Sequence, residues 1–315
     1  MAIPPPLATP ASSPTKLERL VDDFFASCRA RGLSPATLHR GYGHPMRRVF
    51  LPWCEANGIE SVEDIDQRVL DRFSSHLLTE GGSLGRQLSR YSVHSYVRTV
   101  SQFLSWCREQ GEEVHGKPQL PSRPRRVVDV LTRPEIEEME LAATSERDKL
   151  IVRVLADTGI RVGELCALRP EDVKVDGRRT YLKVLGKGSQ ERLVPLAPTL
   201  ARRIERYVRG RPKDTDSDRV FLALRRSRRG NFTALTTSGV LDVVQSAAER
   251  AGVTKRVYPH LFRHSWATEA LRRGMDPLTV ARILGHSSLR MIERTYSHLT
   301  VRDAYDAMLT MLAAD

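Results

Sequence analysis

The sequence of 315 residues has little cysteine and no long apolar run. Its four cysteines are Cys28, Cys54, Cys107 and Cys166, and no two of them form a C-x-x-C pair. They are therefore interpreted as reduced core thiols, and neither disulfides nor a zinc site are expected. No apolar stretch approaches the ~20 residues that span a bilayer. The Pro-, Ala- and Ser-rich residues 1–15 lack the basic and apolar regions of a signal peptide, which predicts a flexible tail on a soluble, cytoplasmic protein.

Acidic residues are in the minority. The chain has 50 Lys and Arg against 38 Asp and Glu, which gives a formal net charge of +12. This balance indicates a polyanionic partner, since each contact with a phosphate releases counterions. Arg-rich composition also arises in GC-rich genomes, so charge alone does not establish nucleic-acid binding. No polybasic amphipathic helix lies beside an apolar anchor, which makes a membrane surface the less favoured partner.

The first folded segment, residues 16–115, is expected to be a compact helical domain. Apolar side chains recur at helical spacing in four stretches, at 17–25, 42–53, 65–78 and 93–106. Four amphipathic helices that pair their apolar faces would share one core.

The second of these stretches carries conflicting signals. Ser34 followed by Pro35 is typical of a helix start. Gly41, Gly43 and Pro45 then follow, and these residues are expected to interrupt the early part of the helix.

An extended linker is expected at residues 116–126. The stretch GKPQLPSRPRR contains three prolines and four basic residues and has no periodicity. A basic linker of this kind either lies along a phosphate backbone or serves as a solvated tether, and the sequence leaves both interpretations open.

The second folded segment, residues 127–315, is expected to be mainly helical with one small antiparallel sheet. A capping box at Thr132–Glu135 precedes its first helix. Strand-like stretches on both sides of a Gly-rich turn predict a hairpin over 181–196. The remainder is largely helical, with one helix expected to start at Asp276 and to end at Gly285.

Several polar residues interrupt these apolar patterns. Arg161 follows a Gly turn at the start of a helix, where backbone donors and a guanidinium could converge on an anion, although a surface arginine is the simpler interpretation. His260 and Arg263 are spaced i, i+3, so they share one helix face. An imidazole beside a guanidinium suits a phosphate with a transferable proton. His260 and His264 also have zinc-like spacing, but Leu261 stands where a metalloprotease has Glu, and no third ligand is evident.

Three further residues carry little information alone. Tyr296 could be a packed aromatic, His286 lies beyond a predicted helix end, and Lys187 sits at a hairpin tip. The GKGS turn around Lys187 is not a P-loop, because Gly188 follows the lysine where that motif has Ser or Thr.

Taken together, these residues resemble the tyrosine recombinase (phage integrase) family. The motifs appear in order as TGIRVGELCALRPEDV, GKGSQERLVPL, HLFRH and LGHSSLRMIERTY. The resemblance covers residues 130–315, and the helical segment before it is similar to the family's core-binding (SAM-like) domain. It implies a mainly α protein with two domains, a core-binding DNA-binding domain at 16–115 and a catalytic domain at 127–315.

The resemblance also implies the chemistry. Tyr296 would attack the scissile phosphate, leaving a 3′-phosphotyrosyl bond and a free 5′-hydroxyl. Lys187 would protonate the leaving 5′-oxygen, with Lys183 as a rival for that role. A tyrosine with a pKa of about 10 needs a nearby base to act as the nucleophile.

The remaining catalytic roles concern the phosphate. Arg161 and Arg263 would bind the non-bridging oxygens, and they would supply the positive charge that a metal ion supplies elsewhere, so no cofactor and no metal are expected. His260 would help to take the tyrosine proton and His286 would bond the phosphate. Glu164 would orient Arg161 or the histidines.

DNA contacts outside the active site are expected on both domains, each residue being otherwise a solvated surface charge. In the first domain the candidates are Arg40, Arg47, Arg48, Arg90, His94 and Arg98. In the second domain a basic run near a predicted loop gives Arg225, Arg226, Arg228 and Arg229. An additional arm-type DNA-binding domain is not expected.

The expected partners are double-stranded DNA and other copies of the chain. The resemblance implies a homotetramer in the synaptic complex, with a partner recombinase or directionality factor left open. The apolar stretch 301–314 would pack into a neighbouring protomer, or alternatively in cis.

Several functions compete. Integration of a mobile element is favoured, because Tyr296 follows His286 by ten residues where many family members have nine. Xer-like resolution of chromosome or plasmid dimers is the alternative. A type IB topoisomerase is disfavoured by His260, a DNA-binding protein without catalysis by the full residue set, and a metallohydrolase by the missing ligands.

Overall fold

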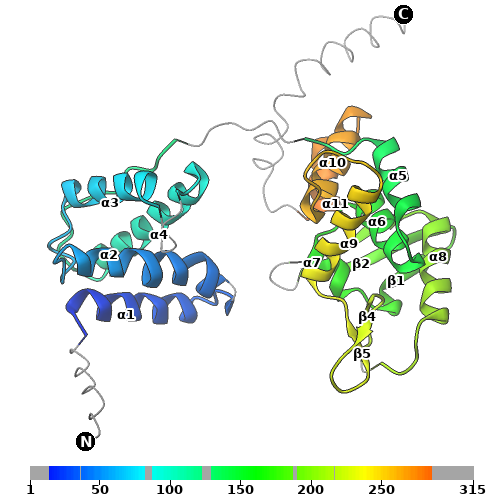
Figure 1. The fold of residues 1–315 in the computed structure, drawn as a ribbon, viewed down its shortest axis with the longest axis horizontal. Coiled ribbons are helices and arrows are strands. Elements are labelled where there is room, and N and C mark those ends of the chain that lie inside the picture. The colour runs from blue at the N-terminus through cyan, green and yellow to red at the C-terminus, as the bar shows by residue number, and fades with distance from the viewer. Residues whose placement is uncertain are drawn as a thin grey trace, which may run out of the picture. The chain divides into compact units, whose positions relative to one another are not determined.

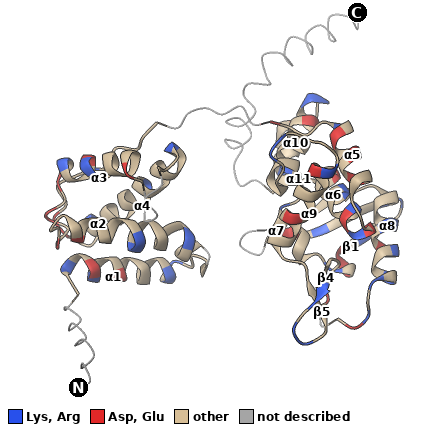
Figure 2. Ribbon diagram, in the orientation of Figure 1, with Lys and Arg blue, Asp and Glu red and all other residues tan. Residues whose placement is uncertain are grey.

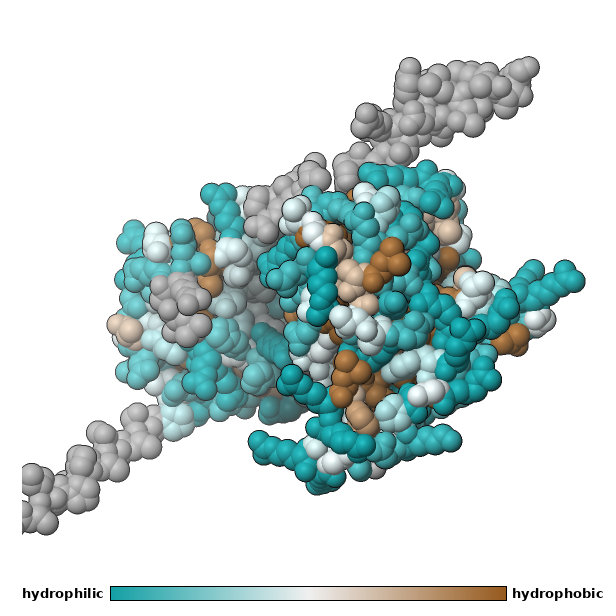
Figure 3. All heavy atoms as spheres, turned by 45° about the vertical axis from the view of Figure 1, so that its right-hand side comes forward, coloured by the Kyte–Doolittle hydropathy of each residue, from teal (hydrophilic) through white to brown (hydrophobic). Residues whose placement is uncertain are grey.

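The structure is a computed structural model that describes residues 14–35, 37–81, 87–122, 129–186, 190–215 and 217–285. It divides into two compact units, Met1–Arg126 and Val127–Asp315 (Figure 1). The face drawn in Figure 3 is mostly hydrophilic with small apolar patches. Among the described residues, no helix combines the length and the apolar character that crossing a membrane requires.

The described residues of the first unit form helices joined by loops, as the sequence predicts. Its helices are α1 (Lys16–Ala30), the π-helix η1 (Thr37–Phe50), α2 (Leu51–Ala56), α3 (Gln67–Thr79) and α4 (Arg90–Glu109). Side-chain caps start α1, α3 and α4, where the hydroxyl or carboxylate oxygens of Thr15, Asp66 and Ser89 each accept a backbone N–H.

The expected interruption at Gly41, Gly43 and Pro45 is wrong, because the chain continues there as the π-helix η1. A proline inside a helix leaves a carbonyl without its usual N–H donor. In a π-helix each N–H bonds to the carbonyl five residues earlier, so the carbonyl affected by Pro45 is that of Arg40. The carbonyl of Gly41 accepts the hydroxyl of Thr99 at 3.2 Å, which ties η1 to α4. A Cβ at position 43 would lie 3.0 Å from the carbonyl oxygen of Leu38, so this close backbone approach suits glycine.

Aromatic rings pack against one another within the core of the first unit. Phe24 packs against Phe103, with ring centroids 5.7 Å apart. Phe73 packs against Phe50 at 5.0 Å and against Trp53 at 5.2 Å. Edge-to-face and tilted pairs of this kind add to the free energy of apolar burial.

The start of the predicted linker is bonded to the first unit. The Gly116 N–H donates to the carbonyl of Ile65 at 3.2 Å, and the Lys117 N–H donates to the side chain of Gln67 at 3.2 Å. The Arg108 side chain donates to the Gly116 carbonyl. Residues 123–126 lie outside the described residues.

The second unit is mainly helical with small antiparallel sheets, which confirms the predicted fold class. Its α-helices are α5 (Arg133–Ala142), α6 (Glu146–Thr158), α7 (Val162–Ala167), α8 (Pro198–Gly210), α9 (Thr237–Arg250), α10 (Pro259–Arg272) and α11 (Pro277–Leu284). A short 3-10 helix, η2 (Pro170–Asp172), precedes the first strand. The predicted capping box at Thr132 and Glu135 and the predicted limits of α11, Asp276 and Gly285, are confirmed.

The strands form two sheets where the sequence predicts one. β1 (Val173–Asp176), β2 (Arg179–Leu185) and β3 (Glu191–Leu196) form an antiparallel sheet in that order, and β2 and β3 are the predicted hairpin. β4 (Leu222–Arg226) and β5 (Phe232–Ala234) form a second antiparallel pair. The sequence analysis missed this pair, since its strands are short, β4 ends in two arginines, and neither strand has an alternating apolar pattern.

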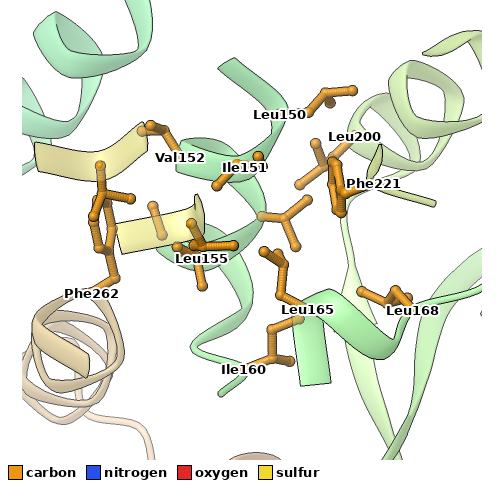
Figure 4. Close-up of a cluster of buried hydrophobic side chains, with 14 of the residues drawn as sticks. Leu150, Ile151, Val152, Leu155, Ile160, Leu165, Leu168, Leu200, Phe221 and Phe262 are labelled. Carbon is orange, nitrogen blue, oxygen red and sulfur yellow. The ribbon is translucent and has the colours of Figure 1, made fainter. Parts of the chain in front are cut away.

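Helix α6 is the centre of the second unit. Leu150, Ile151, Val152, Val154 and Leu155 are all fully buried, so the core encloses most of the surface of the helix (Figure 4). Helices α5, α7, α8, α9 and α10 all contact it. This buried helix ends directly before Arg161 and thereby fixes the start of the candidate site.

The cysteines are free thiols, as expected, and Cys28, Cys54 and Cys107 are buried. Burial raises the pKa of Cys54 to about 12 and, as the leading cause, that of Cys107 to about 12. Thiols with such pKa values are unreactive core groups at neutral pH.

Candidate active site

A tight turn delivers Arg161 to the surface of the second unit. Gly159 ends α6 in the left-handed conformation, with φ of 61°. A Cβ at position 159 would lie 3.0 Å from Leu284 and 3.2 Å from Trp266, so the turn packs closely against α10 and α11. Arg161 then forms the N-cap of α7 with extended backbone.

A buried carboxylate fixes Arg161. Glu164 lies one turn into α7, and 5% of its side chain is exposed. Its oxygens accept the backbone N–H of Arg161 at 2.8 Å and Nη1 of Arg161 at 2.9 Å. Burial raises the pKa of Glu164, but the hydrogen bond from Arg192 and the backbone N–H of Arg161 outweigh that effect and hold the pKa below its usual range. The expected contact between Glu164 and Arg161 is therefore present, with an ionised carboxylate.

The two predicted phosphate-binding arginines converge at the end of α11. Arg263 on α10 is 3% exposed, and it donates to the carbonyls of Gly159 at 2.9 Å and Leu284 at 2.7 Å. Arg161 donates through Nη2 to the next carbonyl, that of Gly285, at 3.0 Å. Carbonyls at a helix C-terminus lack intrahelical donors and carry the negative end of the helix dipole, so they suit guanidinium groups.

His260 lies in the first turn of α10, one turn before Arg263. Partial burial, followed by the charges of Arg263 and Arg161, lowers its pKa from the ordinary value of 6.5. The imidazole is therefore neutral at physiological pH and can accept a proton. The sequence analysis places His260 and Arg263 on one face, and the effect of both guanidiniums on the ring agrees with that placement.

Three predicted residues, Lys187, His286 and Tyr296, lie outside the described residues. The rival lysine is described: Nζ of Lys183 lies 2.7 Å from the Glu191 carboxylate, and this hydrogen bond raises the pKa of Lys183.

The zinc hypothesis receives no support in the described part of the chain. There, no group of three or more His, Cys, Asp or Glu side chains is arranged to hold a metal ion. His264, the second residue of the suggested pair, is 8% exposed.

The predicted DNA-contact residues divide into two groups. Arg47 is bound to Asp22 at 2.8 Å and stacks 4.8 Å above the ring of Phe25. Arg226 is bound to Asp214 at 2.5 Å and stacks 4.7 Å above Phe232. The remaining arginines are exposed side chains, and those of the second unit lie on β4 and the turn after it (Figure 2): Arg40, Arg48, Arg90, Arg98, Arg225, Arg228 and Arg229. His94 is half-buried.

Arg192 is a site residue that the sequence analysis missed. Its Nη1 and Nη2 donate to the two oxygens of Glu164 at 2.8 and 2.7 Å, and its Nε donates to the carbonyl of Ile283 at 2.8 Å. A signal for it existed in the hairpin register, because Arg192 pairs with the buried Val184 and so lies on the inner face of the sheet.

Comparison with known proteins shows the family of the chain. The sequence profile of the phage integrase family matches residues 129–302. The chain is 32% identical to the tyrosine recombinase XerA of Thermococcus kodakarensis, over 90% of this chain and 91% of the relative. It is also 32% identical to a tyrosine recombinase of Pseudothermotoga lettingae, over 94% of this chain and 99% of that protein.

Solved structures show the same fold. The XerH site-specific recombinase bound to its difH substrate superposes with a TM-score of 0.71 at 20% identity, covering 95% of this chain and 98% of that one. The Tn1549 transposon integrase in complex with transposon right-end DNA gives a TM-score of 0.70 at 18% identity, covering 95% and 99%.

Proposed function

Because the chain belongs to the phage integrase family of tyrosine recombinases, which are DNA strand-transferring enzymes, we propose that it catalyses site-specific recombination through Tyr296. The tyrosine hydroxyl attacks the scissile phosphate, the Oη–P bond forms and the bond from phosphorus to the 5′-oxygen breaks. The energy of the phosphodiester is retained in the 3′-phosphotyrosyl bond. A 5′-hydroxyl from a second duplex then reverses the step and joins the exchanged strands.

The observation that carries this proposal is the convergence of Arg161 and Arg263 on adjacent carbonyls, those of Gly285 and Leu284. Arg161 and Arg192 share the Glu164 carboxylate, so two guanidiniums stand against one negative charge there. Pre-positioned guanidiniums stabilise a pentavalent phosphate without reorganisation during the reaction.

Proton transfer is assigned to His260 and Lys187. His260 is neutral because of its lowered pKa, so it accepts the proton that leaves Tyr296. Lys187 gives a proton to the leaving 5′-oxygen. Lys183 is the poorer candidate, since its ion pair with Glu191 raises its pKa and makes it a weaker acid. His286 donates a hydrogen bond to the phosphate.

The proposed substrate is double-stranded DNA, bound by both units, with a tetramer as the active assembly. Lambda integrase has been solved as a tetramer bound to a Holliday junction, with a TM-score of 0.62 to this chain at 20% identity. Exposed arginines on both units would contact phosphates. Arg47 and Arg226 are poorer candidates than the rest, because each already has a carboxylate partner and an aromatic ring.

Two biological roles share this chemistry. The spacing of ten residues between His286 and Tyr296 favours integration of a mobile element. Xer-type dimer resolution is the second candidate, because the similarity to XerA of Thermococcus kodakarensis and to XerD of Bifidobacterium longum covers 90% or more of this chain.

The test begins by finding the DNA site. Wild-type protein and Tyr296→Phe are incubated in EDTA with sheared chromosomal DNA of the source organism, and the reaction is stopped with detergent. DNA that remains covalently attached to wild type is sequenced. The recovered site is then rebuilt as a nicked suicide duplex, on which the cleaved strand end diffuses away and the adduct accumulates.

We expect a slowly migrating protein–DNA band with wild type that is absent with Tyr296→Phe. A band that requires a metal ion, or that persists in Tyr296→Phe, would refute the mechanism. A site at the ends of a mobile element identifies an integrase, and a single chromosomal site whose loss leaves dimers unresolved identifies an Xer-type enzyme. Relaxation of supercoiled plasmids that lack the site would instead indicate a topoisomerase.

A further inference from the structure

We propose that Arg192 is a positioning residue for DNA cleavage, which shares the Glu164 carboxylate with Arg161 and ties β3 to the end of α11. The inference rests on the proposed function. It adds a residue whose contribution passes through Arg161 and not through direct contact with the phosphate.

Each nitrogen of the Arg192 guanidinium donates a hydrogen bond within the protein. Nη1 and Nη2 form a two-pronged pair with Glu164, and Nε bonds to the carbonyl of Ile283. Its side chain is 13% exposed. Since all three of its nitrogens already donate to protein oxygens, Arg192 acts on the substrate through its neighbours.

The same side chain also supports the segment that leads to His286. Gly285 ends α11 with φ of 65°, and a Cβ there would lie 3.0 to 3.1 Å from Cδ, Cζ and Nε of Arg192. The backbone of Gly285 therefore lies against the Arg192 side chain, and its carbonyl accepts a hydrogen bond from Arg161. Arg192 thus joins three segments that are distant in sequence: the start of α7, β3 and the end of α11.

Charge gives Arg192 its effect on the reaction. Glu164 is buried beside Arg161, and a carboxylate in that position with a single cationic partner would bind that partner with both oxygens. Arg192 already donates to both oxygens of this carboxylate. The Arg161 side chain therefore keeps a single bond to Glu164 and one to the Gly285 carbonyl. The rest of the Arg161 side chain, which is 39% exposed, remains available to a phosphate.

Four variants separate this role from simple stabilisation. Arg192→Gln removes the charge and leaves Glu164 to Arg161. Arg192→Lys keeps the charge but loses the planar fork. Glu164→Gln/Arg192→Gln removes both charges, and the amide oxygen can still accept the backbone N–H of Arg161. The matched control is Arg203→Gln, since Arg203 on α8 also binds two carboxylates, those of Glu140 and Glu146, away from the site.

The readouts are the first-order rate of covalent adduct formation on the suicide duplex at saturating protein, the Kd for the same duplex, and the Tm of each variant. All rates are taken at a temperature where every variant is folded. We expect Arg192→Gln to cleave about 30-fold more slowly than wild type with a Kd within about threefold, since an electrostatic contribution to the transition state is lost. The double variant is expected to recover at least about threefold over Arg192→Gln, because the Arg161 guanidinium no longer faces an unshared carboxylate. Arg203→Gln should cleave at the wild-type rate.

A double variant that is no faster than Arg192→Gln would overturn the proposal, because a purely structural arginine predicts additive losses. Wild-type cleavage by Arg192→Gln would also overturn it. If Arg192→Gln does not fold, Arg192→Lys decides: slower cleavage with unchanged Kd supports the proposal, and a wild-type rate refutes it. Absence of any adduct with wild type would instead refute the proposed function itself.

Discussion

Among the described residues, the first unit has one buried polar side chain, Thr99, whereas the second unit buries charged groups of both signs. The buried charged residues of the second unit are Glu140, Arg147, Asp148, Glu164 and Arg263. Burying a charge costs free energy unless it is paired and hydrogen-bonded. The core of the first unit is therefore held by apolar packing, which includes aromatic pairs. The second unit also contains buried charges, and its ion pairs and hydrogen bonds offset the free-energy cost of removing those charges from water.

The buried charges of the second unit fall into two sets. Glu140 binds Arg153 and Arg203, and Arg147 binds both Asp148 and the carbonyl of Leu222, so this set joins α5, α6, α8 and β4. Glu164 and Arg263 form the other set. Glu164 is paired with the partly exposed guanidinium of Arg161, and Arg263 lies near the neutral imidazole of His260. Buried charge by itself therefore does not identify an active site. The convergence of charge with an accessible surface and a proton acceptor does.

The largest expected effect separates these sets by function. Arg263→Ala should lower the rate of adduct formation by about 10³-fold, since it removes a buried guanidinium that is fixed by two carbonyls at the end of α6 and α11. The rate is measured on the suicide duplex at saturating protein, and DNA binding is measured separately by gel shift.

Arg153→Ala is the control for this prediction, because it removes a guanidinium of the remote set whose side chain is 15% exposed. It should lower stability and leave the rate on folded protein unchanged. Equal losses of rate in both variants would show that the two sets are not functionally distinct.

A second prediction addresses the aromatic core of the first unit. Phe73→Ala should lower the free energy of opening there by about 3–4 kcal/mol, because it leaves a cavity beside Phe50 and Trp53. Hydrogen exchange, resolved to peptides of α3 and α6, measures each unit within the full chain. Phe73→Leu, which keeps most of the volume, should cost about 1 kcal/mol. Protection lost equally in α6 would contradict the separation of the two cores.

A third prediction tests the turn before Arg161. Gly159→Ala should destabilise the protein by about 2–3 kcal/mol, because φ is positive and the added Cβ meets Leu284 and Trp266. Gly274→Ala is the matched control, since Gly274 also has positive φ, at 79°, but open space around it. It should cost about 1 kcal/mol. Urea denaturation compares the two, and equal costs would show that the close packing of the turn contributes nothing.

Local signals were enough to predict several elements. The Thr132–Glu135 capping box and the Asp276 and Gly285 limits of α11 lie in the sequence next to the helices that they define. Arg161, His260 and Arg263 were found because each lies in a short ordered motif. The glycines and proline of η1 gave the wrong local prediction, because the chain continues there as a π-helix that packs on α4, where Gly41 is bonded to Thr99, 58 residues away.

The role of Arg192 could not be derived from local pattern either. Its partners are Glu164, 28 residues away, and the carbonyl of Ile283, 91 residues away. The spacing of apolar residues likewise did not predict the β4–β5 pair. Arg226 in β4 is held by Asp214 and by the ring of Phe232 and not by an apolar face. What the sequence hides in both cases is a contact that only the folded chain creates.

The smallest expected effect concerns His260 and pH. In the folded protein, partial burial and the charges of Arg263 and Arg161 hold the pKa of His260 below 6.5. Between that lowered pKa and about 6.5 the unfolded chain binds a proton that the folded chain does not, so stability rises with pH across this window. His260→Asn lacks this dependence. Its stability relative to wild type should therefore be higher on the acidic side by a few tenths of a kcal/mol, a small value because water screens the charges around His260.

Urea denaturation of both proteins from about pH 5 to about pH 8 measures this difference, and the NMR titration of the His260 ring gives its midpoint directly. The same lowered pKa keeps the proton acceptor neutral in mild acid, so the acidic limb of wild-type cleavage should follow that midpoint. A midpoint at or above 6.5 would mean that the two guanidiniums do not act on the ring. In that case the positive charge of Arg161 and Arg263 would not keep His260 neutral in mild acid.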